Sequence, residues 1–241
     1  MNETYDLIVV GAGPAGLMAA VTAAKKNLKV ALIERKTKTT AVKRSCCTAL
    51  INEPGTHEEF VTLKNNRLIF HRSDFSIPYD GPRIPLKQMI KFSPKGNRFV
   101  VEREEDPVAI ALNKECLLEG LTEEVQKLGV TILSGTHALK AENIGEEVVV
   151  TVRQKDKTFD LSSKTAIAAD GVNSRLTEEL GLNKARKHFG TMQALTYYVE
   201  GVECPYPPAW MVFVGRGHVP SGKGQLYVLP KPQKYGSSVY C

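Results

Sequence analysis

The opening of the chain alternates in the order strand, glycine turn, helix, strand. An apolar run over residues 5–10 ends on the turn Gly11-Ala-Gly13-Pro-Ala-Gly16. Residues 17–26 are rich in alanine, as is typical of a helix, and residues 29–34 form a second apolar run that closes on an acid. This order predicts a parallel βαβ unit, because two neighbouring parallel strands need a crossover connection between them.

The three glycines of this turn have the spacing of a dinucleotide-binding turn. Gly11 permits a tight turn after the strand, and Gly13 lets the backbone come within hydrogen-bonding reach of a pyrophosphate. Gly16 lets the helix pack closely on the sheet. Together with Pro14 and Ala15 they predict a pyrophosphate site at the helix N-terminus, where unpaired N–H groups converge. Three glycines can also form a turn and nothing more, but the flanking strands, the helix and the terminal acid favour the nucleotide site.

Glu34 ends the second strand, about twenty residues after the turn. Its carboxylate is placed to accept hydrogen bonds from the ribose diol of an adenosine. The same charge would repel a 2′-phosphate, so FAD or NAD fits this crevice better than NADP.

The composition, with 42% hydrophobic and 24% charged residues in 241, is ordinary for a globular protein. The net charge of +6 is spread along the chain, although residues 35–44 hold five cations and no acid. We interpret this stretch as a solvated basic surface beside a cofactor that carries two phosphates. No nucleic-acid partner is needed to explain it.

The five cysteines include no CxxC pair, and no histidines have ligand spacing. This pattern predicts neither a metal site nor a disulfide framework, and it favours a reducing compartment. We expect no signal peptide, because the N-terminus runs straight into a core strand, and no membrane span, because no apolar run approaches the ~20 residues required. The chain is therefore expected to be cytoplasmic, with any membrane contact peripheral.

The chain is expected to visit two regions alternately. Residues 1–66 and 111–182 should form a nucleotide domain, and residues 67–110 and 183–241 an antiparallel sheet domain. The elements expected after residue 35 are a helix over 113–128, closed by Gly129, and strands over 67–70, 76–79, 97–102, 130–133, 137–142, 147–153, 157–161, 165–169, 192–199 and 225–229.

Asp170 and Gly171 follow the short apolar strand expected at 165–169. A carboxylate followed by glycine at the C-terminal end of a strand lies on the ligand-binding edge of an open α/β sheet, where it can meet a ribose or a water bound to a pyrophosphate. The alternative is an Asp-Gly turn in a hairpin, which the pair alone would favour.

Taken together, these motifs resemble those of the flavoprotein hydroxylase superfamily typified by para-hydroxybenzoate hydroxylase, and most closely those of its geranylgeranyl reductase group. That family opens on the same GxGxxG turn with an acid-arginine pair, here Glu34-Arg35, and carries a GADGxxS motif, here Ala168 to Ser174. Its RxxLxxxL helix start is matched from Lys114 to Leu121, with Lys in place of Arg. Lys still offers a phosphate a positive charge, but without the bidentate fork.

The resemblance implies an α/β fold in which a Rossmann-like FAD-binding domain, made of a parallel sheet and a β-meander, is interleaved with a mainly antiparallel β-sheet substrate domain. It implies FAD as cofactor, and NAD(P)H or another reductant as electron donor. The residues that it assigns to FAD are Gly11, Gly13, Pro14, Ala15, Gly16, Glu34, Arg35, Lys114, Ala138, Asp170, Gly171 and Ser174.

Within the reductase group, a cysteine-glycine stretch follows the second strand and approaches the flavin ring. Cys46 and Cys47 stand there in this chain and become the candidate catalytic residues, although free cysteine is more often a small buried hydrophobe. Residues 220–231 resemble a later strand of the group, which makes Tyr227 and Pro230 candidates to line an apolar substrate pocket. Aromatic residues on such a sheet are also common in an ordinary core.

The implied activity is reduction of C=C bonds in a polyprenyl or isoprenoid lipid by hydride transfer from reduced flavin. The expected partners are a hydrophobic small molecule or lipid and an electron-donor protein. Two alternatives stay open: a flavin-dependent monooxygenase or halogenase of small aromatic substrates, and a truncated, non-catalytic nucleotide-binding remnant.

Proteins of this family continue into a third FAD motif, a Gly-Asp pair before a long helix. The 241 residues contain no Gly-Asp pair. The sequence is therefore expected to be a fragment, to be completed by a partner chain, or to be a decayed relative.

Overall fold

The computed structural model describes residues 4–42, 46, 48–52, 59–187, 190, 193–216, 218–219, 224–233 and 239–240. The chain divides into two compact units, each built from two segments. The first unit comprises Met1–Val42 and Leu118–Thr191, and the second comprises Lys43–Leu117 and Met192–Cys241. The domain limits expected from the sequence, at residues 66, 110 and 182, stay a prediction.

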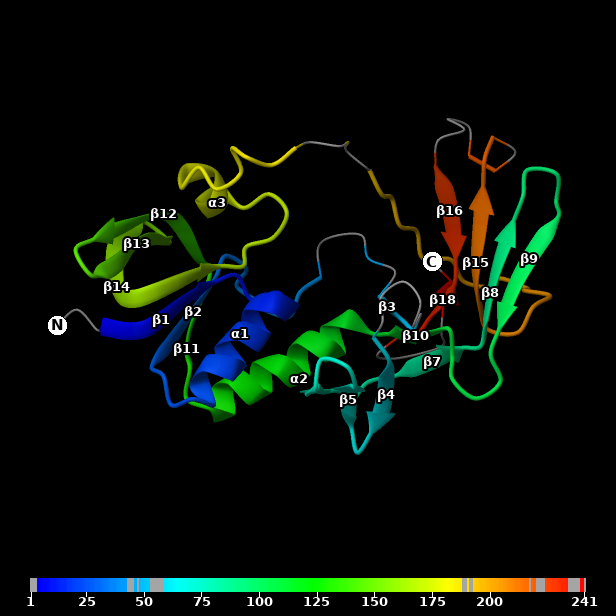
Figure 1. Cartoon of the computed structure of the whole chain (residues 1–241), viewed down its shortest axis with the longest axis horizontal. Helices are drawn as coiled ribbons and strands as arrows, with labels where there is room; N and C mark the ends of the chain where they lie inside the picture. The colour runs from blue at the N-terminus through cyan, green and yellow to red at the C-terminus, as the bar shows by residue number, and fades with distance from the viewer. Residues whose placement is uncertain are drawn as a thin grey trace. The chain divides into compact units, whose positions relative to one another are not determined.

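The first unit is built on a six-stranded sheet (Figure 1). Its strands, in spatial order, are β11 (Thr131–Ser134), β2 (Val30–Glu34), β1 (Thr4–Val10), β14 (Lys157–Ala168), β13 (Glu147–Gln154) and β12 (Thr136–Ile144). The first four run parallel, whereas β14, β13 and β12 form an antiparallel meander. The predicted Rossmann-like sheet with an attached meander is confirmed.

Strand β14 differs from the prediction, which placed two strands at 157–161 and 165–169. The structure has one strand through Ala168, because Ser163 pairs with Val148 of β13 on one side and with Tyr5 of β1 on the other. The strand thus passes from the meander into the parallel sheet without a turn, and its C-terminal end lies beside the end of β1.

Three helices accompany the strands: α1 (Pro14–Ala24), α2 (Lys114–Lys127) and α3 (Arg175–Glu179). In Figure 1, α1 lies along β1 and β2, and its Leu17 is fully buried. The C-terminal part of α2 belongs to the same unit, where Lys25 of α1 pairs with Glu124 at 2.7 Å. Gly129 follows α2 at a φ of +76°, so the predicted glycine C-cap is confirmed.

The second unit consists mainly of antiparallel sheets, as predicted. They are β3 (Ala49–Ile51) with β10 (Ala109–Leu112) and β7 (Arg83–Leu86); β16 (Gln225–Val228) with β15 (Ala209–Val214), β8 (Gln88–Phe92) and β9 (Arg98–Glu102); β4 (Val61–Lys64) with β5 (Arg67–Phe70) and β6 (Phe75–Pro78); and β17 (Pro230–Lys231) with β18 (Val239–Tyr240). Only the β8–β15 pair runs parallel among the described strands of this unit.

Two segments of the second unit differ from the prediction. Between Pro78 and Pro107 the sequence predicted only the strand at 97–102, but the structure also has β7 and β8 there, and Pro85 is tolerated because β7 is an edge strand. The strand expected over 192–199 is absent from residues 193–198, and only Val199 forms an isolated bridge, to Tyr240. Apolar and aromatic residues alone do not make a strand where no neighbour pairs with them.

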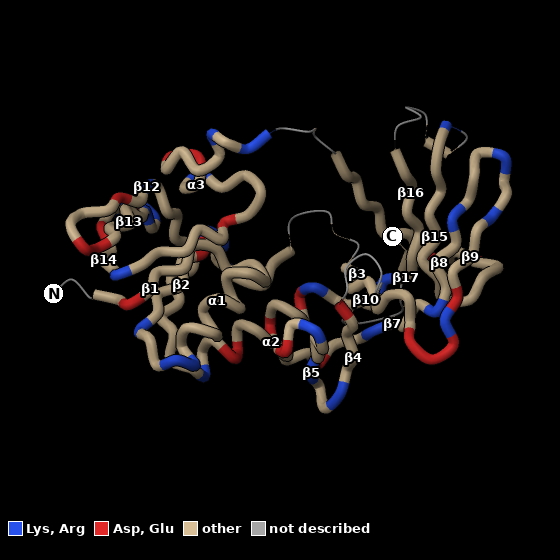
Figure 2. Tube along the Cα trace, viewed as in Figure 1, with Lys and Arg blue, Asp and Glu red and all other residues tan. Residues whose placement is uncertain are grey.

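Lysine, arginine and acidic residues are distributed along the traces of both units, in agreement with the charge pattern of the sequence (Figure 2). No helix among the described residues is long and apolar enough to span a membrane.

We expect Gly16→Ala to destabilise the first unit, because a Cβ at this position would overlap the carbonyl oxygen of Gly11 and crowd the Cβ of Ala169 at 3.3 Å. The expected loss in the free energy of unfolding is about 3 kcal/mol, at the upper end of what overpacking costs, measured by urea denaturation. Gly190→Ala is the matched control, because a Cβ there meets nothing within 4 Å. Equal stability of the two variants would contradict this packing.

Candidate functional site

The glycine turn after β1 is held between two neighbouring strands. Gly11 has a φ of +106°, and its N–H donates to the carbonyl of Ile33 in β2 at 2.7 Å. A Cβ at Gly11 would overlap the carbonyl of Ala169, which follows β14. Both the backbone conformation and the lack of space therefore require glycine here.

Helix α1 begins directly after Gly13. Gly13 is the N-cap, with no side-chain cap, and Pro14 occupies the first turn. A Cβ at Gly13 would meet no atom within 4 Å, so the space in front of the helix is open. The N–H groups of Ala15 and Gly16 lie in the first turn, where a helix offers them no carbonyl partner. This end of α1 is suited to an anion.

Glu34 reaches from the end of β2 to the glycine turn. One carboxylate oxygen accepts a hydrogen bond from the N–H of Ala12 at 2.8 Å, and the other accepts from the N–H of Lys36 at 2.9 Å. The side chain is buried. Since each carboxylate oxygen can accept a second hydrogen bond, Glu34 can brace the turn and still bind hydroxyls.

Asp170 lies at the same edge of the sheet, because the N–H of Ala169 donates to the carbonyl of Val10 at 2.8 Å. One oxygen, Oδ2, accepts from the N–H of Arg175 at 3.2 Å. The other, Oδ1, is buried and has no partner among the described residues. A buried carboxylate oxygen without a donor is rare, and it marks a place where a ligand or water completes the site.

The other residues assigned to FAD are spread more widely. In the first unit, the Ser174 hydroxyl caps α3 by accepting from the N–H of Thr177 at 3.0 Å, and Ala138 lies in β12 next to a register shift. Arg35 is exposed just after β2. Lys114 is the first residue of α2 and belongs to the second unit. The structure brings Gly11, Glu34 and Asp170 together. The side chain of Ser174 instead caps the N-terminus of α3.

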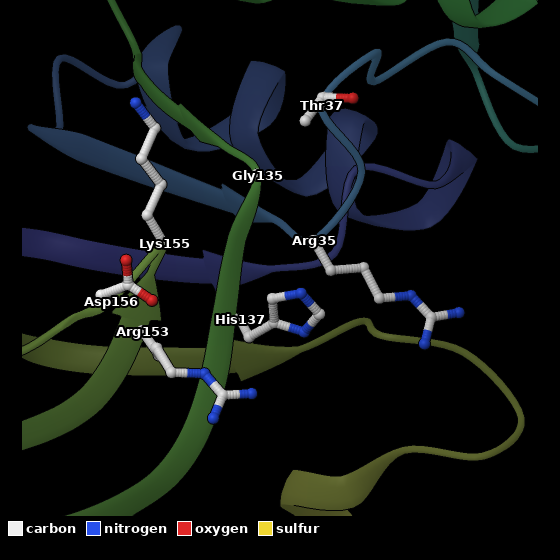
Figure 3. A pocket seen from close by; sticks show the side chains of 7 residues that line it. All are labelled: Arg35, Thr37, Gly135, His137, Arg153, Lys155 and Asp156. Carbon is white, nitrogen blue, oxygen red and sulfur yellow. The ribbon is translucent and has the colours of Figure 1, made fainter.

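A pocket lies beside the end of β2 and the start of β12 (Figure 3). Arg35, which follows β2, lines it together with His137 of β12 and Arg153 of β13, which stand opposite each other in the sheet. Ala138 follows His137 in β12, so the pocket adjoins a second residue assigned to FAD. It therefore belongs to the same candidate cofactor site.

Asn113 and Tyr79 hold the N-terminus of α2, beside the candidate Lys114, and the sequence reasoning did not give them this role. The side-chain oxygen of Asn113 accepts from the N–H groups of Glu115 and Cys116 at 3.0 and 3.2 Å, and thereby caps α2. The Tyr79 hydroxyl donates to the carbonyl of Pro82 at 2.6 Å and accepts from the Asn113 N–H at 3.0 Å. Burial raises the pKa of Tyr79 to about 12. An asparagine just before a helix was the available signal.

Cys46 and Lys114 interact electrostatically in the second unit. Partial burial by itself would raise the pKa of the Cys46 thiol. Attraction to the Lys114 ammonium, together with hydrogen bonds from Thr48 and Lys114, outweighs burial and lowers the pKa below its usual value of 9.0. Cys47, the other candidate, lies outside the described residues.

The two candidate substrate residues also lie in the second unit. Tyr227 in β16 is exposed, and its ring lies tilted beside that of Trp210 at a centroid distance of 6.0 Å. Pro230 in β17 is buried and pairs with Tyr240.

A protein-family model described as "FAD binding domain" matches residues 4–215, which include both sequence motifs and most of the two units. The chain belongs to this family. The family resemblance, which was predicted from the sequence motifs, is confirmed.

Curated relatives of the chain include two reductases. The chain is 27% identical to digeranylgeranylglycerophospholipid reductase of Methanocaldococcus jannaschii, over 96% of this chain and 54% of the relative. It is 28% identical to digeranylgeranylglycerophospholipid reductase 1 of Methanococcoides burtonii, over 96% of this chain and 52% of the relative. The chain therefore spans about half the length of the curated relatives it matches.

Solved structures share the fold. A geranylgeranyl bacteriochlorophyll reductase-like protein from Thermoplasma acidophilum aligns with a TM-score of 0.72 at 21% identity, covering 99% of this chain and 55% of its own. The myxobacterial halogenase CndH aligns with a TM-score of 0.61 at 15% identity, covering 99% and 52%. At these identities the likeness concerns the fold and does not choose between reductase and halogenase.

We expect Lys114→Met to raise the pKa of Cys46, because the variant removes the ammonium that stabilises the thiolate. The measurement is the pH dependence of Cys46 alkylation by iodoacetamide, read by mass spectrometry of its peptide. Lys127→Met, at the other end of α2, is the matched control and should leave the midpoint unchanged. An identical midpoint in wild type and Lys114→Met would show that the two side chains do not interact.

Proposed function

We propose that the first unit binds FAD at the edge formed by the glycine turn, Glu34 and Asp170. The buried Oδ1 of Asp170, which has no donor among the residues that the structure describes, carries this proposal, because a hydroxyl of a bound nucleotide would supply one. Family membership over residues 4–215 supports the choice of FAD among dinucleotides.

The residues present fit the parts of FAD. The N–H groups of Ala15 and Gly16 are suited to its pyrophosphate, and the open space at Gly13 leaves room for it. The free acceptor capacity of Glu34 suits the ribose hydroxyls. We assign further cofactor contacts to Arg35, Lys114, Ala138, Gly171 and Ser174 by the same family resemblance.

We further propose that the complete protein is an FAD-dependent oxidoreductase that reduces C=C bonds of an isoprenoid lipid. The names of the curated relatives support this substrate class. FAD, when bound, supplies the hydride chemistry. The electrons come from NAD(P)H or another reductant, or from an electron-donor protein, and a lipid substrate implies peripheral contact with a membrane.

Cys46 supplies the proton in this proposal. Saturation of a double bond needs a proton as well as a hydride, and Cys46 Sγ can release one, because its lowered pKa makes it a stronger acid than an ordinary thiol. The Lys114 ammonium then stabilises the thiolate that remains. Tyr227, which is exposed, and Pro230, which is buried in β17, are the proposed contacts of the isoprenoid chain, and Cys47 is the alternative to Cys46.

The test uses the flavin-loaded protein, reduced anaerobically and mixed with a phospholipid that carries unsaturated isoprenoid chains. Mass spectrometry is expected to show the gain of two hydrogens for each reduced double bond. Lack of lipid reduction, combined with oxygen-dependent hydroxylation or halogenation of an aromatic compound, would favour the alternative enzyme class. A protein that binds no flavin would overturn the assignment of the cofactor.

We expect Gly13→Ala to fold but to bind FAD weakly. The added Cβ points into open space in the protein, where it would meet the pyrophosphate instead. A loss of affinity of about tenfold or more corresponds to about 1.4 kcal/mol and is measured by flavin absorbance after equilibrium dialysis. Gly190→Ala serves as the control, and unchanged affinity in Gly13→Ala would exclude close contact at this position.

A further inference from the structure

Two hairpins of the second unit meet at one end of its four-stranded sheet. The turn between β8 and β9 and the turn between β15 and β16 lie at the same end, because β8 and β15 are parallel neighbours. The two turns also contact each other. His218 Nε2 donates to the carbonyl of Ser93 at 3.0 Å, and a Cβ at Gly215 would crowd the side chain of Pro94 at 2.6 Å. We call this part of the sheet the hairpin end.

The described charged residues of the hairpin end are all basic and exposed. They are Lys91, Lys95, Arg98 and Arg216. The sequence contains no acid in residues 89–101 or 209–229. Acids gather at the opposite end of the sheet, where Glu102 closes β9 and residues 104–106 follow it. Figure 2 shows this separation, with blue around the turn between β8 and β9 and red beyond the end of β9.

Apolar side chains are exposed beside these cations on both edge strands. Phe99 and Val100 of β9 are 63% and 40% exposed, and Leu226 and Tyr227 of β16 are 49% and 44% exposed. Each is the second or third residue of its strand, counted from the turn. The hairpin end therefore combines positive charge with exposed apolar surface.

The register of the sheet places aromatic residues and a lysine in one row. Tyr227, Val212, Lys91 and Phe99 stand opposite one another across the four strands, so they share one face. A lysine in such a row can lay its alkyl stem on the apolar side chains and keep its ammonium in a polar layer.

Protection of the sheet edges is a simpler explanation for the cations. Charged side chains on edge strands do prevent pairing with other chains. That role is served by a polar edge, whereas Phe99 and Leu226 leave both edges apolar. A nucleic acid would use the cations but not the apolar surface. Basic residues together with exposed phenylalanine, leucine and tyrosine are typical of surfaces that lie in a membrane interface.

We propose that the hairpin end docks on an anionic phospholipid bilayer. Lys95 and Arg216, in the two turns, meet the lipid phosphates, and Phe99 enters the boundary between headgroups and acyl chains. The inference deepens the proposed function, because an enzyme that acts on an isoprenoid lipid takes its substrate from a membrane. Docking itself needs no catalysis.

The first experiment measures flotation of the FAD-loaded protein with vesicles of equal parts phosphatidylcholine and phosphatidylglycerol, compared with pure phosphatidylcholine. Binding is expected on the anionic vesicles, and added salt should weaken it. Lys95→Gln combined with Arg216→Gln should lower the affinity roughly fivefold for each charge, or about 25-fold together. The matched control combines Lys64→Gln with Lys87→Gln, which removes two exposed lysines of the same unit outside the hairpin end.

The second experiment tests the apolar contact. Phe99→Ala is expected to weaken binding to the anionic vesicles about tenfold, because the phenyl ring loses its burial in the bilayer. Phe159→Ala, at an exposed phenylalanine of the first unit, is the control, and circular dichroism checks that each variant is folded. If Phe99→Ala binds the vesicles like wild type, and duplex DNA binds as tightly as they do, the hairpin end is a general polyanion site and the proposal is overturned.

The proposal is also overturned if the protein binds no anionic vesicles, or if the Lys95 and Arg216 variant binds them as tightly as the Lys64 and Lys87 control. Reduction of a detergent-dispersed isoprenoid lipid is measured in parallel. Lipid reduction without vesicle binding would reject docking alone, and vesicle binding through the hairpin end without lipid reduction would reject the proposed reaction alone.

Discussion

The close approach of the glycine turn to the end of β14 is the contact on which the nucleotide unit depends. Gly11 and Gly16 lie against each other and against Ala169, with no room for a side chain on either glycine. This packing fixes where α1 begins and which way its first N–H groups face. Gly13, by contrast, has open space around it, so the protein fold does not explain why a side chain is missing there. A ligand does.

The two acidic residues at this edge of the sheet differ in how far their oxygens are already hydrogen-bonded by the protein. Glu34 uses both oxygens to hold the backbone around the turn, and is largely satisfied without a ligand. Asp170 keeps one buried oxygen without a donor. Because β14 runs unbroken from the meander to Ala168, it carries Asp170 to the glycine turn across a long sequence separation. The fold therefore holds the Glu34 side of the site by hydrogen bonds to the backbone, and it leaves Oδ1 of Asp170 without a donor among the described residues.

The sequence predicted most where local chemistry decides the structure. The turn at Gly11, the end of α2 at Gly129 and the acid at Glu34 follow from backbone conformation and spacing, and each was predicted. The predictions that were wrong concerned strands whose pairing depends on residues far away in the sequence. The strand that holds Pro85 exists because β10 pairs with it, and no described strand pairs with residues 193–198 before Val199. The capping role of Asn113 could be predicted locally, because asparagine stands just before the helix. That His137 stands opposite Arg153 could not, because it depends on the strand register of the meander.

NMR titration of the isotopically labelled chain with ADP tests the account most directly, since ADP carries the pyrophosphate and ribose without the flavin. The account predicts that the amide signals of Ala12, Ala15 and Gly16 move together with that of Asp170, and saturate at a common concentration. Binding of ADP that leaves these amides unmoved, or no binding at all, would contradict it.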